Sequence, residues 1–292
     1  MKRKQRGALF GVSLVMAFVL MLVGIAGCGD QRAEGPGGKD AGLYVVTTTS
    51  LIGHIVDQVG GDRVRVATIV PPASCPGHFD VKPAEMKVLT GADIFFVHAW
   101  QGEMFTDELI RSVGNEHLRK EVLAIEGNWM TPPVQKAAIE HIAAVLAEAD
   151  PDNASFFEAN AAAQLETVDT VGQELAARLA AAGVDSVKVL VSEMQTGFLK
   201  WAGFDVVAPF GRPEDMSPRE MEDLLALGRE AQVDLVVDNL QSGHEAGKTI
   251  ARDLGARHVM LSNFPGGLPG TDTWESAIKK NVDLLLEAIE VL

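Results

Sequence analysis

The stretch that decides the fold runs from Asp152 to Ala182 and reads DNASFFEANAAAQLETVDTVGQELAARLAAA. It contains no proline and a single glycine, and its apolar side chains recur at intervals of three, four or seven residues. That period places them on one face of a helix. About thirty helical residues extend roughly 45 Å, more than the width of one small lobe. We therefore predict a rigid helix over residues 152–183 that joins two lobes, in preference to an ordinary long surface helix. The apolar positions are Phe157, Ala161, Leu165, Val168, Leu175 and Leu179.

Short apolar runs alternate with helical patterns on both sides of this helix. Such alternation is typical of mostly parallel sheets. We expect an α/β protein with an N-terminal lobe over residues 43–151, a C-terminal lobe over 184–292 and a ligand cleft between them. The expected strands are Tyr44–Thr48, Arg65–Val70, Asp93–Val97, Ser186–Val191, Asp205–Ala208, Asp234–Val237 and Arg257–Leu261, and the expected helices include Leu51–Val59, Pro83–Thr90, Ser217–Ala231 and Gly243–Leu254.

The amino-terminal residues predict the compartment. Four basic residues precede an apolar run, Ala8–Ala26, which leads into Ile25-Ala26-Gly27-Cys28. Small residues before a cysteine are typical of a bacterial lipobox, in which the cysteine is lipidated after cleavage. We predict a signal peptide over residues 1–27, a lipid on Cys28 and a flexible tether over 28–42. An uncleaved membrane anchor is the alternative, and either one places the chain outside the cytoplasm, held at the cell surface or in the periplasm.

The amino-acid composition of the chain limits the kinds of partner that it can bind. Residues 1–27 hold four Lys or Arg and no acidic residue, so the processed chain has 21 basic and 40 acidic residues, a formal charge of −19. This balance argues against nucleic-acid binding, which needs basic patches. Only Cys75 remains besides Cys28, so no internal disulfide can form. We expect a monomer that is stabilised by its hydrophobic core.

Polar side chains follow several expected strands. In open parallel sheets the ligand binds beyond the carboxyl ends of the strands. The densest group is Cys75, His78 and Asp80, a thiol, an imidazole and a carboxylate that can each ligate a transition metal. The alternative is a proline-stiffened loop with an incidental thiol. Further metal ligands could come from the second lobe, where helix capping is the competing role: Glu193, Asp238 and Asn263.

The remaining cleft candidates suit an organic ligand as well as a metal. They are His98, Trp100, Trp129, Gln195 and Gln241. The sequence has none of the His-Glu-x-x-His, Gly-x-Ser-x-Gly or phosphate-loop patterns of enzymes, so we expect a binding protein without a catalytic cofactor.

Several motifs resemble the zinc- and manganese-binding family of ABC-importer solute-binding proteins. The similarity extends from about Tyr44 to the C-terminus. It implies two α/β lobes bridged by one helix, one transition-metal ion carried between them as cargo, and delivery to a membrane permease with its ATPase. The motifs are Thr47-Thr48-Thr49-Ser50-Leu51-Ile52, Gly60-Gly61-Asp62-Arg63-Val64, Val70-Pro71-Pro72 before Pro76-Gly77-His78-Phe79-Asp80, and Asp150-Pro151-Asp152-Asn153 before Phe157-Glu158-Ala159-Asn160.

This chain departs from the resembled family at the ligand positions. The three family histidines fall on Gly77, Gly127 and Glu193, and the late aspartate falls on Asn263, while His78 stands one place beyond the first position. One hypothesis is a metal-ion receptor with a rearranged site. The second is a receptor for a metal chelate or a small organic solute. The third is a lipid-anchored adhesion or interaction protein that transports nothing.

Overall fold

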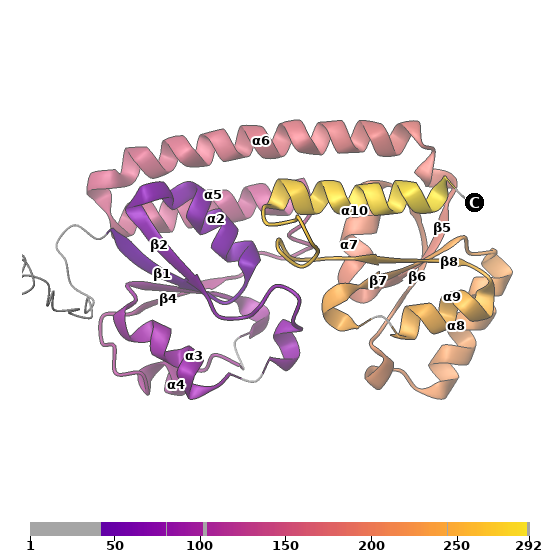
Figure 1. The fold of residues 1–292 in the computed structure, drawn as a ribbon, viewed down its shortest axis with the longest axis horizontal. Coiled ribbons are helices and arrows are strands. Elements are labelled where there is room, and N and C mark those ends of the chain that lie inside the picture. Colours follow the sequence, from indigo (N-terminus) through magenta and orange to yellow (C-terminus); the bar gives the residue numbers. More distant parts are fainter. Residues whose placement is uncertain (1–41, 80, 102–103, 244, 291–292) are drawn as a thin grey trace, which may run out of the picture. The chain divides into compact units, whose positions relative to one another are not determined.

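Two four-stranded parallel sheets organise the chain (Figure 1). The computed structural model describes residues 42–79, 81–101, 104–243 and 245–290. The strand order is β2-β1-β3-β4 in the N-terminal sheet and β6-β5-β7-β8 in the C-terminal sheet. This confirms the expected α/β fold. The bounds are β1 Leu43–Thr47, β2 Val64–Thr68, β3 Ile94–His98, β4 Arg119–Leu123, β5 Lys188–Ser192, β6 Asp205–Phe210, β7 Leu235–Asn239 and β8 Arg257–Leu261.

Each of the seven predicted strands overlaps an observed one, and β4 was not predicted. Its sequence is Arg-Lys-Glu-Val-Leu, and only Leu123 is buried. β4 is an edge strand that pairs with β3 alone. A charged edge is a common device against unwanted strand pairing, and it removes the apolar signal by which the other strands are recognised.

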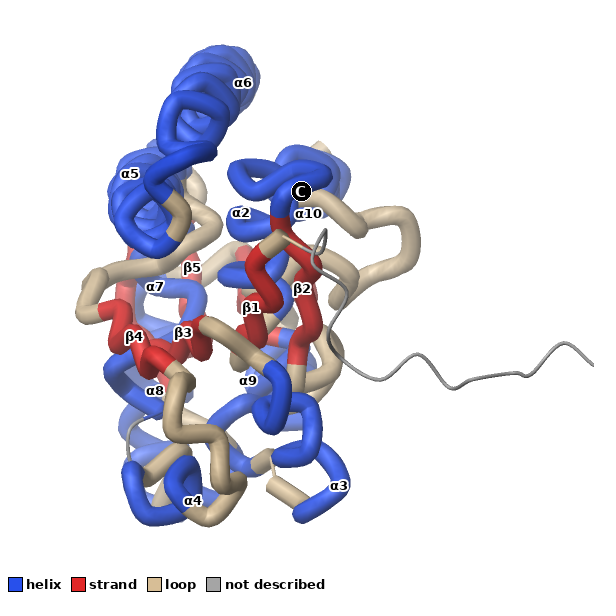
Figure 2. Tube along the Cα trace, turned by 90° about the vertical axis from the view of Figure 1, so that its left-hand side faces the viewer, coloured by secondary structure: helices blue, strands red, loops and turns tan. Residues whose placement is uncertain are grey.

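Helices cover both faces of the sheets (Figure 2). One layer contains α2, α5, α6 and α10, and the opposite one contains α3, α4, α8 and α9. The helices named from the sequence do not include α4, α7 or α10, and the predicted helix from Pro83 continues beyond α3 as a 3-10 turn. The bounds are α2 Ser50–Gly60, α3 Pro83–Met86, α4 Asp107–Arg111, α5 Pro132–Ala149, α6 Ala154–Ala181, α7 Thr196–Ala202, α8 Pro218–Ala231, α9 Glu245–Leu254 and α10 Trp274–Ile289.

Helix α6 is the long helix that the sequence predicts. It extends over both sheets and packs on α2 and α5 at one end and on α10 at the other (Figure 1). Its buried Phe157 and Leu175 belong to one hydrophobic cluster that also contains Val45 of β1 and Val189 of β5. A core that continues from one sheet to the other resists hinge motion, because separating the lobes would expose it to water.

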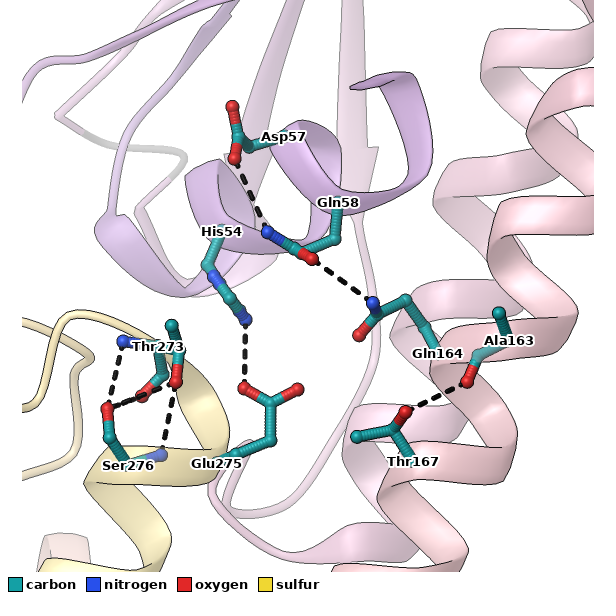
Figure 3. Close-up of polar contacts among 9 residues, drawn as sticks. All are labelled: His54, Asp57, Gln58, Ala163, Gln164, Thr167, Thr273, Glu275 and Ser276. Atoms are coloured by element: carbon teal, nitrogen blue, oxygen red, sulfur yellow. Dashed lines mark hydrogen bonds and ion pairs between the residues drawn. The ribbon is translucent and has the colours of Figure 1, made fainter.

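Side-chain contacts join α2 to α6 and to the start of α10 (Figure 3). Gln164 of α6 donates a hydrogen bond to Gln58 of α2 at 3.1 Å. The Nε2 atom of His54 on α2 lies 3.6 Å from a carboxylate oxygen of Glu275 on α10. The hydroxyl of Ser50 donates to the carbonyl of Pro265 at 2.7 Å. Helix α2 therefore contacts the C-terminal lobe through Ser50 and His54.

The predicted signal peptide, the lipidation site Cys28 and most of the tether lie outside the described residues. Within the described part of the chain, no helix combines the length and apolar character needed to cross a bilayer.

Candidate functional site

One cavity of about 420 Å³ lies where the carboxyl ends of strands from both sheets meet. This is the edge at which parallel α/β sheets bind their ligands, and its volume is in the usual range for small-molecule sites. Its described lining comes from the last residues of seven of the strands or the segments that follow them, and from the start of α2. The lining residues are Leu51, Pro76, Gly77, His98, Trp100, Gly127, Asn128, Trp129, Met194, Arg212, Asn239, Gln241, Ser242, Asn263 and Phe264.

His98, the last residue of β3, is the most buried polar side chain facing this cavity from the N-terminal sheet. Its exposed fraction is 1 %, and its Nε2 atom lies 2.9 Å from the hydroxyl of Thr49. Burial lowers the pKa of His98 to about 3, so the imidazole is neutral at physiological pH. Its Nδ1 atom has no hydrogen-bond partner among the described residues. A buried polar atom without a partner is costly.

Two tryptophans pack on this imidazole. Trp100 stacks on His98 with ring centroids 5.0 Å apart and 18° between the planes, while Trp129 meets it edge-on at 4.5 Å. Trp129 is buried and donates its indole N–H to the carbonyl of Ile125. Trp100 is 57 % exposed. Trp129 is thus a fixed wall of the cavity, whereas Trp100 still has ring surface for another planar group.

An amide network also lines the cavity and crosses between the halves of the chain. Asn128 donates to the side-chain oxygen of Asn263 at 2.9 Å, and Asn263 donates to the carbonyl of Met194 at 3.0 Å. Gln241 donates to the carbonyl of Pro72 at 2.8 Å and accepts the backbone N–H of Asn263. These bonds hold the two lobes around the cavity and fix the direction of its amide groups.

The guanidinium of Arg212 links the two lobes at the loop of Cys75 and His78. Its Nη2 donates to the Cys75 sulfur at 3.1 Å, and Nη1 lies 3.2 and 2.9 Å from the two ring nitrogens of His78. His78 is 59 % exposed at its side chain. Neither Cys75 nor His78 lines the cavity. A metal ion on either side chain would have to displace a positively charged guanidinium.

The structure does not bring all five of the predicted metal ligands together. Glu193 is exposed on the 3-10 turn Glu193–Gln195 and does not line the cavity. Asp238 is buried and lies 2.7 Å from Nε2 of His258. In the part of the chain that the structure describes, no group of three or more His, Cys, Asp or Glu side chains could hold a metal ion.

The length of β7 explains why Asp238 does not face the cavity. The strand runs to Asn239, two residues past the predicted end. Asp238 is therefore inside a strand, where successive side chains point to opposite faces. Asn239 faces the cavity, and Asp238 faces α9, where a Cβ on Gly247 would be within 2.2 Å of its carboxylate.

The remaining sequence candidates divide into three groups. Asn263, His98, Trp100, Trp129 and Gln241 line the cavity. Gln195 is buried and bonds to Asn239 but is not part of the lining. Asp80 lies outside the described residues.

Sequence analysis missed Arg212 as a site residue. The residue follows β6, whose predicted end at Ala208 was two residues short of Phe210. Arg212 is the second residue after the true end of β6, so it belongs to the strand-end residues among which ligand contacts were expected. Three of the four positions at which the resembled family places ligands do line the cavity, but they are occupied by Gly77, Gly127 and Asn263.

Comparison with known proteins gives a consistent result along almost the whole chain. A family described as periplasmic zinc-uptake complex component A (ZnuA) matches residues 45–288. The manganese-binding lipoprotein MntA of Halalkalibacterium halodurans is 22 % identical, with 94 % of this chain and 97 % of the relative covered. The metal ABC transporter substrate-binding lipoprotein FimA of Streptococcus parasanguinis is 23 % identical, with 95 % and 98 % covered.

Solved structures share the fold. A manganese-bound periplasmic metal-binding protein from Candidatus Liberibacter asiaticus superposes with a TM-score of 0.73 at 17 % identity, covering 85 % of this chain and 99 % of that one. A crystal structure of ZnuA superposes with a TM-score of 0.71 at 22 % identity over the same shares. At these identities the superpositions establish the architecture alone.

Proposed function

Since this chain belongs to the family of the periplasmic zinc-uptake complex component A, we propose that it is the extracytoplasmic receptor of an ABC importer for metal uptake. Its curated relatives are named as metal- or manganese-binding lipoproteins of such importers. The single observation that carries the proposal is the cavity at the carboxyl ends of the strands of both sheets. That position is where this architecture binds small ligands.

Cargo capture in this receptor requires little lobe closure. The hydrophobic cluster under α6 continues from Val45 to Leu285, and direct hydrogen bonds such as Asn128 to Asn263 already join the two sides of the cavity. The cargo therefore enters and leaves through local movement near exposed Trp100 and Met194, which are 57 % and 48 % exposed.

The amino-terminal sequence supports attachment to the membrane through a lipid on Cys28. A tether of about fifteen residues would keep the receptor close to a membrane permease and its ATPase while leaving it free to rotate. The lipid anchor on Cys28 and delivery to a permease both belong to the proposed function.

Uptake of radioactive zinc and manganese by intact cells tests this function. Cells that lack the chain should accumulate less of at least one metal, and a plasmid copy should restore uptake. A copy with Cys28→Ser should release the protein from the membrane and restore uptake poorly. Equal uptake of both metals with and without the chain would contradict the proposal.

A further inference from the structure

The charge of the cavity is opposite to what a bare metal cation needs. Among its described lining residues there is no Asp, Glu or Cys, and Arg212 is the one charged side chain. His98 is neutral because of its burial. The remaining polar lining consists of hydroxyl and amide groups, which are weak ligands for zinc compared with thiolates, imidazoles and carboxylates.

Arg212 keeps its charge and part of its hydrogen-bonding capacity. Its described partners, Cys75 and His78, are not carboxylates, and no ion pair joins it to an acidic group among the described residues. A guanidinium has five N–H donors, so donors remain after these contacts. Its planar fork matches a carboxylate in two parallel hydrogen bonds. A cation beside it would be repelled, and an anion would be attracted.

The aromatic wall of the cavity fits a flat ligand. Trp100 stacks on His98 through one face and remains more than half exposed at the edge of the cavity. Met194, which also lines the cavity, is 48 % exposed. Exposed tryptophan and methionine on one cavity form apolar surface that a ring can cover. A bare ion would cover none of it and would fill a small part of about 420 Å³.

We propose that the cargo is a planar organic anion, free or as the chelator of a metal ion, that pairs with Arg212 and stacks on Trp100. This inference rests on the proposed function of the chain as an importer receptor and specifies what the receptor recognises.

Calorimetric titration of the full chain in detergent tests the inference. The probes are dipicolinate and salicylate, two planar carboxylates, together with their neutral amides and Zn²⁺ alone. At least one acid should bind roughly 10- to 100-fold more tightly than its amide, the range expected for a charge-assisted hydrogen bond. Tighter binding of dipicolinate with one equivalent of Zn²⁺ identifies a chelate, and equal binding identifies a free anion.

Variants test whether Arg212 causes the preference for acid over amide and whether Trp100 contributes to binding of both. Arg212→Gln should remove the preference for acid over amide, Arg212→Lys should keep part of it, and Trp100→Ala should weaken acid and amide alike. Arg219→Gln is the matched control, because Arg219 is 90 % exposed on α8 and does not line the cavity. Circular dichroism of each variant confirms that it is folded.

Equal affinity for acids and amides would overturn the inference, and so would no binding of either acid. Stoichiometric binding of Zn²⁺ alone that Arg212→Gln leaves unchanged would also overturn it, while the proposed function in metal uptake would stand. Loss of the uptake phenotype in cells is a separate measurement, so the two proposals can fail independently.

Discussion

His54 on α2 and Glu275 on α10 form a contact between the two halves of the chain, with the imidazole Nε2 atom 3.6 Å from the carboxylate (Figure 3). The contact with His54 is the largest cause that lowers the pKa of Glu275 from its ordinary value of 4.5 to about 2. Both side chains are largely shielded from solvent, at 10 % and 23 % exposure. The contact lies on the helical layer that also carries α6, away from the cavity.

The depressed pKa of Glu275 predicts acid sensitivity. The unfolded chain takes up this proton near pH 4.5 and the folded chain near pH 2, so the stabilisation is complete above pH 4.5 and is lost as the pH falls toward 2. Glu275→Gln should flatten the dependence of the unfolding free energy on pH in this interval, measured by urea denaturation. Glu287→Gln, at an exposed carboxyl on the same helix, should leave that dependence unchanged. An identical effect of both substitutions would contradict this assignment.

The imidazole of His98 should not titrate in the physiological range. Burial lowers its pKa from 6.5 to about 3, so the unfolded chain binds this proton at higher pH than the folded chain. The stabilisation is complete above pH 6.5 and is lost as the pH falls toward 3. In NMR spectra the ring C–H signal of His98, identified by its absence in His98→Gln, should stay fixed between about pH 8 and pH 5. A titration midpoint near 6.5 would show that the ring is accessible to water.

Asp238 should matter for stability and not for cargo binding. Its carboxylate is buried against His258 at 2.7 Å, on the face of β7 opposite the cavity. Asp238→Asn should lower the unfolding free energy by about 1–3 kcal/mol, because it weakens a buried hydrogen bond to a charged group. Affinity for the acid probe should remain within about twofold. Asp223→Asn on the exposed face of α8 is the control for loss of one charge. A large drop in affinity would restore Asp238 as a ligand residue.

Gly127 should resist substitution by any side chain. Its φ is +104°, and a Cβ would lie 2.9 Å from a methyl group of Val134. Gly114 has φ +75° with nothing within 4 Å of a Cβ. An alanine at position 114 would therefore have the unfavourable positive φ but no steric clash. Gly127→Ala should therefore destabilise by about 1–3 kcal/mol more than Gly114→Ala, as overpacking does, in thermal or urea unfolding. Equal costs would show that Val134 can move aside.

The sequence alone determined the architecture through local periodicity. The 3.6-residue repeat of residues 152–182 and the short apolar runs around it depend only on which side chains must be buried, so α6 and the central strands could be predicted. The edge strand β4 could not, because its exposed side chains carry charge instead of an apolar pattern. Helix α10 was not among the predicted helices although its buried residues, such as Leu285, are apolar.

The rim of polar residues at the strand ends was also predictable, and five of the residues expected in the cleft line the cavity. Which of them face the ligand was decided by tertiary structure. Asp238 and Asn239 are neighbours in sequence, yet one faces His258 and the other the cavity, because β7 extends through both. Arg212 reaches Cys75 and His78 across more than 130 residues of chain. A long-range contact of this kind leaves no periodic trace in the sequence, since it depends on how the two sheets pack, and it sets the charge of the site.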